Sequence, residues 1–261
     1  MLRKLIKNEL ISTWKTMVLL HVILLIAAFI GRWTLLELFR YRSPRVLLIL
    51  LLLASAVTLI FVSFATMFFI AFRFYSNLFS DQGYLMFTLP VTPTQLLISK
   101  FVSGSLWILM DMLVSYLAIG IVCFNPTLIG NFQIFMNEIT LVFGCSFRQL
   151  FVLFILFSIA GCISSSLLIY VSIAIGQLFK KHRALVAVIC YFIITMSIQI
   201  ITTIVLLISG FFTMDSATGN PFVTSFYSSF ICKLSILISV IATILSFITT
   251  WYIMNKKINL N

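Results

Sequence analysis

The chain has 261 residues, of which 62% are hydrophobic and 9% charged, with a formal net charge of +11 and a mean hydropathy of +1.20. A soluble domain carries about 25% charged residues, so this composition excludes an ordinary soluble domain and indicates a polytopic membrane protein. The basic residues lie between apolar runs, which makes the lipid bilayer, rather than nucleic acid, the expected partner. The five cysteines show no metal-ligand spacing. Cys123 and Cys145 bracket one loop and can pair outside, although buried apolar roles are favoured.

Six apolar segments are long enough to cross a bilayer, since a span requires about 20 apolar residues. The expected fold is therefore all-α, with one membrane domain over residues 1–261. The spans are expected at about 14–33, 46–72, 98–122, 149–176, 184–211 and 229–254.

The first thirteen residues predict an interfacial helix on the inner leaflet. Apolar side chains recur at every fourth position from Leu2 to Trp14, and basic side chains occupy other faces. This pattern is typical of a basic amphipathic helix at a membrane surface. The alternative is a frayed basic end that only sets topology.

Lysine and arginine predict that both termini are cytoplasmic. With this orientation, eleven of the 17 basic residues fall in inner segments and five in outer segments, while Lys233 lies within the sixth span. Four of the five outer arginines lie between spans one and two, and locally they favour the opposite orientation.

The interval from Arg73 to Lys100 joins spans two and three on the predicted cytoplasmic side. Thr92 is a candidate N-cap, Pro93 fits the first helical position and Gln95 completes a capping box. Upstream, 74–79 is expected to continue span two. Residues 81–87 then form a short amphipathic piece with an apolar knuckle, which is interpreted equally well as a protein contact or as a loop folded back on its helix ends.

This interval resembles a bacterial ABC transporter permease of the type-2 exporter class, over about one tenth of the chain. The matching residues are Asn77-Leu78-Phe79, Asp81, Gly83-Tyr84-Leu85, Phe87-Thr88-Leu89-Pro90 and Gln95-Leu96-Leu97-Ile98-Ser99-Lys100. The resemblance implies a coupling helix between spans two and three that seats in a separate ATP-binding subunit. The implied contact residues are Asp81, Gly83, Tyr84, Leu85, Phe87 and Pro90, with 177–183 as a lesser contact.

Asp111 lies near the middle of span three, where an acid is costly and is not expected to face lipid. One interpretation makes it a structural acid that is protonated or hydrogen-bonded to Ser or Thr on a neighbouring span. The other places it on the wall of a substrate path, with Lys233 as a poorly matched partner in depth. Two outer segments, 125–148 and 214–229, are expected to be an interfacial helix and a turn-rich loop that dips back into the membrane.

The resemblance implies a permease that moves a peptide or amphiphilic substrate out of a bacterial cell, as a dimer with a second copy or a paralogue. ATP and Mg would be bound by the partner subunit, with no cofactor in this chain. No phosphate-loop motif occurs, and only two histidines are present, so no enzyme is expected in this polypeptide. His21 is expected to be a satisfied residue of span one, and Ser164-Ser165-Ser166 a site of helix packing. The alternatives are an ATP-independent secondary transporter or channel, and a sensor or assembly protein.

Overall fold

The computed structural model describes residues 1–40, 46–79, 83, 91–123, 134, 136–137, 146–179, 181–208 and 221–256. Within these residues the chain is helical and contains no strand. Six helices are long and apolar enough to cross a membrane, which confirms the predicted fold class. The chain divides into two compact units, Met1–Pro126 and Thr127–Asn261, and each is described by itself.

The first unit consists of α1 (Leu2–Arg40), α2 (Val46–Phe79) and α4 (Pro93–Cys123), which all pack on one another. Its apolar core gathers Leu24 and Ala28 of α1, Val62 of α2 and Ala118 of α4. Helices α1 and α2 approach closely above this core: a Cβ added to Gly31 would lie 2.7 Å from the Ser55 Oγ. Small residues at such crossings let helix backbones come together in a membrane.

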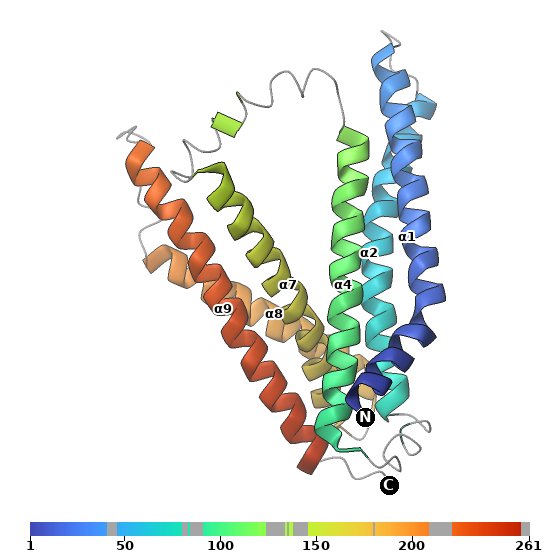
Figure 1. The fold of residues 1–261 in the computed structure, drawn as a ribbon, viewed down its shortest axis with the longest axis vertical. Helices are drawn as coiled ribbons and strands as arrows, with labels where there is room; N and C mark the ends of the chain where they lie inside the picture. The colour runs from blue at the N-terminus through green and yellow to red at the C-terminus, as the bar shows by residue number, and fades with distance from the viewer. Residues whose placement is uncertain are drawn as a thin grey trace. The chain divides into compact units, whose positions relative to one another are not determined.

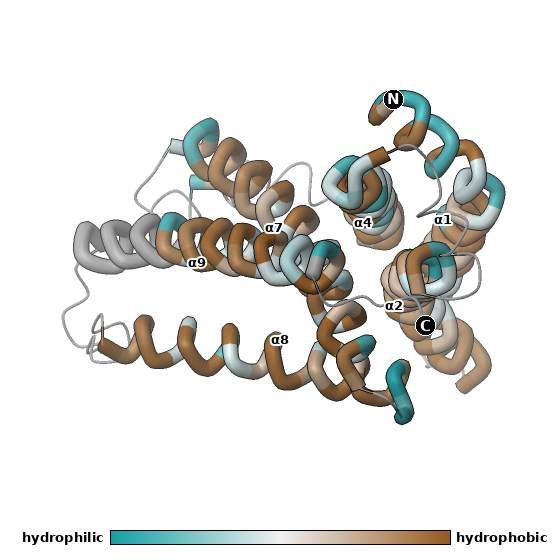
Figure 2. The backbone as a smooth tube through the Cα atoms, turned by 90° about the horizontal axis from the view of Figure 1, so that it is seen from below, coloured by the Kyte–Doolittle hydropathy of each residue, from teal (hydrophilic) through white to brown (hydrophobic). Residues whose placement is uncertain are grey.

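Helix α1 contains both the predicted interfacial segment and the first span, with no break between them. Its 39 residues extend about 58 Å at a rise of 1.5 Å per residue, against a hydrocarbon thickness of about 30 Å. Figure 1 shows its first turns bending away from the axis of the rest, and Figure 2 shows these turns to be mixed in hydropathy. Trp14 of the predicted apolar stripe is exposed, whereas Glu9 and Thr13, on another face of the helix, are buried.

The start of α4 confirms the predicted cap. The Gln95 backbone N–H donates to the Thr92 hydroxyl at 3.3 Å, and the Leu96 N–H donates to the Thr92 carbonyl at 3.1 Å. Pro93 is the first helical residue, where its missing N–H costs nothing. Helix α2 continues to Phe79, also as predicted.

The second unit consists of α7 (Phe147–Gly176), α8 (Arg183–Ile208) and α9 (Pro221–Lys256), with α7 packed on both of the others. Ser164 and Ser166 are buried on α7, and the Ser166 hydroxyl donates to the carbonyl of Ile163 at 2.8 Å. Figure 2 shows α8 to be apolar along almost its whole length. These features fit packing within a membrane, with the Ser166 hydroxyl satisfied by its own helix.

The sixth helix begins earlier than predicted, because α9 starts at Pro221 rather than near residue 229. Residues 221–229 were expected to belong to a loop, and this expectation is wrong. The physical reason is that proline is well suited to the first helical turn, and Pro221 is the first residue of α9. Of the other predicted outer segment, Ile134, Met136 and Asn137 are helical, while most of it lies outside the described residues. Cys123 carries a free thiol at the end of α4.

Candidate functional site

Only one of the predicted coupling residues is described by the structure, namely Gly83, which is buried. A Cβ at this position would lie 2.5 Å from the Leu78 carbonyl oxygen and 2.8 Å from its carbon. The backbone therefore turns tightly against the end of α2, at a point where only glycine fits. The others lie outside the described residues: Asp81, Tyr84, Leu85, Phe87 and Pro90.

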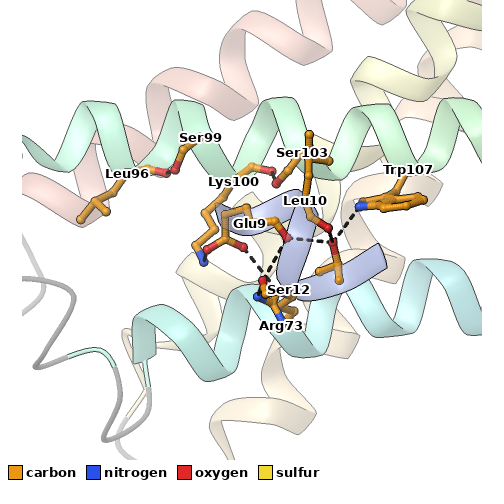
Figure 3. A network of polar contacts seen from close by, with 10 residues as sticks. Glu9, Leu10, Ser12, Arg73, Leu96, Ser99, Lys100, Ser103 and Trp107 are labelled. Carbon is orange, nitrogen blue, oxygen red and sulfur yellow. Dashed lines mark hydrogen bonds and ion pairs between the residues drawn. The ribbon is translucent and has the colours of Figure 1, made fainter. Parts of the chain in front are cut away.

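Three charged side chains meet where α2 ends and α4 begins, as Figure 3 shows. The Glu9 carboxylate of α1 pairs through Oε1 with the Lys100 ammonium of α4, and through Oε2 with the Arg73 Nε of α2 at 3.3 Å. Arg73 also donates to the Ser12 hydroxyl. One carboxylate thus joins all three helices of the first unit.

The Glu9 cluster, defined as Glu9, Arg73 and Lys100, is mostly withdrawn from solvent. The Glu9 and Lys100 side chains are 10% and 4% exposed, and that of Arg73 is 25% exposed. Charges are buried in proteins only when paired, because an isolated buried ion loses its hydration without compensation. Each oxygen of the Glu9 carboxylate meets one cation, so the cluster depends on this single acid.

A tryptophan extends the polar contacts from the cluster toward the middle of the helices. The Trp107 Nε1 donates to the Thr13 hydroxyl at 2.8 Å, and this hydroxyl lies 2.8 Å from the Glu9 carbonyl, to which it donates. The Trp107 ring also stacks on the His21 ring, with centroids 6.3 Å apart and planes inclined by 26°. Buried Trp N–H groups need a partner, and Thr13 supplies it.

Asp111 faces the interior of the first unit and contacts both neighbouring helices. The Thr66 hydroxyl of α2 donates to its Oδ1 at 3.0 Å, and the His21 Nε2 of α1 lies 3.5 Å from the same oxygen. All three residues are buried. A hydrogen bond with Ser or Thr on a neighbouring span was one of the two interpretations of Asp111, and the bond with Thr66 is present. A role for Asp111 in a substrate path stays a prediction, and Lys233 is exposed on α9.

Neither Glu9 nor the approach of His21 to Asp111 was predicted from the sequence. Both signals exist in the sequence. Glu9, Thr13, Met17 and His21 recur at every fourth residue and so share one face of α1. Lys100 and Asp111 are eleven residues apart, which is about three turns of α4. Polar residues on one face of an otherwise apolar helix are costly unless neighbouring helices supply partners. That cost could have indicated that this face of α1 packs against polar groups of other helices.

Nothing in this arrangement resembles a metal centre, since no three His, Cys, Asp or Glu side chains gather in the described ranges. The chain matches no protein-family model, and comparisons with curated proteins and with solved structures also give no match. The architecture itself defines the class: a multi-pass α-helical membrane protein.

Proposed function

We propose that this chain is the membrane-spanning permease subunit of an ATP-driven ABC exporter in a bacterial plasma membrane, with both termini cytoplasmic. It would act with a separate ATP-binding subunit that binds ATP and Mg, and with a second permease copy or a paralogue. The exported substrate would be a peptide or another amphiphile. Support comes from the six long apolar helices, from the long N-terminal helix, and from the resemblance between residues 77 and 100.

The observation that carries this proposal is the Glu9 cluster. Arg73 and Lys100 lie on either side of the segment expected to contact the ATPase, and both are held by one carboxylate of α1. A displacement of that segment would therefore move the ends of α2 and α4 together, and α1 with them. Such a mechanical connection is what a coupling element requires, because interfaces between packed helices transmit motion as rigid bodies.

The test is purification of the tagged chain from the membranes of its own host in mild detergent. We expect an ATP-binding cassette subunit to copurify and the complex to hydrolyse ATP. Gly83→Val should lower the amount of copurified ATPase, because any Cβ at Gly83 meets the Leu78 backbone. Gly120→Val is the matched control, since a Cβ there meets nothing within 4 Å. Recovery of the chain without any ATPase partner, at full membrane level, would contradict the proposal.

The second candidate is an ATP-independent secondary transporter, which one observation favours. Ion-coupled transporters place ionisable residues within their spans, and His21 and Asp111 face each other there. Reconstituted protein without any ATPase should then move substrate when an ion gradient is applied. Transport that requires the ATP-binding subunit and ATP would exclude this candidate.

A further inference from the structure

Two titratable side chains face each other inside the first unit without a hydrogen bond between them. The His21 Nε2 is buried and has no hydrogen-bond partner among the described residues. It lies 3.5 Å from the Asp111 Oδ1, which already accepts a hydrogen bond from Thr66. A buried nitrogen without a partner is costly, and no described neighbouring group supplies the hydrogen bond that His21 needs.

We propose that His21 and Asp111 form a proton-binding site, and that the bound proton joins α1 to α4. A neutral imidazole beside a carboxylate leaves one net negative charge in a buried place, which is unfavourable. Uptake of one proton from water on the His21 Nε2 gives an imidazolium that donates to the Asp111 carboxylate, and the pair is then neutral overall. The proton then lies between the two groups, and the His21 nitrogen gains the partner that it lacks.

Among the residues that the structure describes, no other titratable group that faces the pair competes with it for this proton. From α2, the pair is faced by the Thr66 hydroxyl, which does not titrate in the ordinary range, and from α4 also by the Trp107 ring. Of the other charged groups toward the N-terminal end of the unit, Glu9, Arg73 and Lys100 pair with one another. The remaining basic residues of α1 there are exposed, namely Arg3, Lys4, Lys7 and Lys15.

Helix geometry keeps the Glu9 cluster distant from the proposed site. Glu9 precedes His21 by twelve residues, about 18 Å along α1, and Lys100 precedes Asp111 by eleven, about 16 Å along α4. On the other side, Arg32 lies eleven residues beyond His21 and donates to the Val122 carbonyl at 3.4 Å. Glu37 pairs with Arg40 still further along α1. No charge in the described part of the unit replaces the missing proton.

The site stands independently of the proposed permease function, because it rests only on contacts within α1, α2 and α4. Its consequence is that proton occupancy sets how firmly α1 is attached to α4 at mid-helix. Helix α1 also carries Glu9, which holds the ends of α2 and α4. Protonation at mid-helix and the ion cluster therefore act on the same helix.

The chain allows a direct measurement because it has only two histidines. In His182→Gln, the single remaining histidine is His21, and its ring can be followed by NMR with labelled histidine in lipid nanodiscs. We expect the ring to change between its neutral and protonated forms as the pH is lowered. Asp111→Asn in the same background should move the midpoint by about 1 pH unit or more, since a charge within about 4–6 Å shifts titrations by about 1–3 units.

Two results would overturn the proposal: a His21 ring that keeps one form across the whole range in which the protein stays folded, or a midpoint that Asp111→Asn leaves unchanged. If Asp111→Asn is not recovered in folded form, fluorescence decides instead. Trp107 stacks on His21, and an imidazolium quenches a neighbouring indole. A variant with Phe at the other three tryptophans should lose emission in step with protonation of the His21 ring. Emission that ignores pH, or that responds equally after His21→Gln, would refute the site.

Discussion

Replacing Glu9 by glutamine gives the sharpest test of how the first unit is held together. Glu9→Gln keeps the size of the side chain but removes the charge that pairs with Lys100 and Arg73. Removing one partner of a buried ion pair costs about 3–5 kcal/mol, because the other charge remains buried and uncompensated. Lys100 is 4% exposed, but Arg73 is 25% exposed and partly screened by solvent. We therefore expect a loss of about 3 kcal/mol, or roughly a 100-fold change in the folded-to-unfolded ratio.

The same helix provides the matched control. Glu37 also pairs with an arginine, but Arg40 is 76% exposed, and exposed pairs contribute about 0–1 kcal/mol. The free energy of unfolding of both variants can be measured by denaturant titration in bicelles, with tryptophan fluorescence as the signal. Adding Lys100→Met to Glu9→Gln should recover part of the loss, because the buried ammonium is then gone. Equal stability of Glu9→Gln and Glu37→Gln would refute the reasoning.

Three further predictions concern topology, packing and the mid-helix acid. Cysteine-accessibility labelling should place Lys181 in the cytoplasm and Gly219 outside; labelling of Gly219 only from the inner side would reverse the layout. Gly176→Ala should destabilise the second unit by about 1–3 kcal/mol, because the new Cβ would lie 2.8 Å from the Ala187 Cβ and from the Arg183 carbonyl oxygen of α8. Gly161→Ala is the control, since a Cβ there meets nothing within 4 Å, and equal thermal stability of the two variants would contradict the prediction. Asp111→Leu should lower membrane levels, since it removes the hydrogen bond from the Thr66 hydroxyl and places an apolar group against the buried His21 nitrogen, while Asp111→Asn keeps an acceptor. Export that changes with Asn at normal membrane level would instead support a substrate path.

The helices could be predicted from the sequence because length and hydropathy decide them locally. An apolar run as long as the one in α2 indicates a membrane span by its length alone. The start of α4 at Thr92-Pro93 depends only on four neighbouring residues. The start of α9 was missed because Pro221 is equally a turn former and a first helical residue.

The candidate site was harder to predict, because its residues are distant in the sequence. Glu9 meets Lys100 across 91 positions and Arg73 across 64, and no local pattern determines which basic residue an acid will meet. The apolar stripe of the N-terminal segment gave no sign of the face that carries Glu9 and Thr13, which are buried by partners on α2 and α4. Tertiary contacts of this kind override the periodicity of a single helix.

The 91-residue separation of Glu9 and Lys100 also orders the biogenesis of the first unit. The ribosome adds about 5–20 residues each second, so α1 waits on the order of 5–20 s before α4 can bring its lysine to Glu9. During that interval α1 has Glu9 and His21 in the membrane region without their partners from α4. Helix α1 is thus made before the partners of its buried polar groups exist. The Glu9 carboxylate gains its second cation only when α4 packs beside α1.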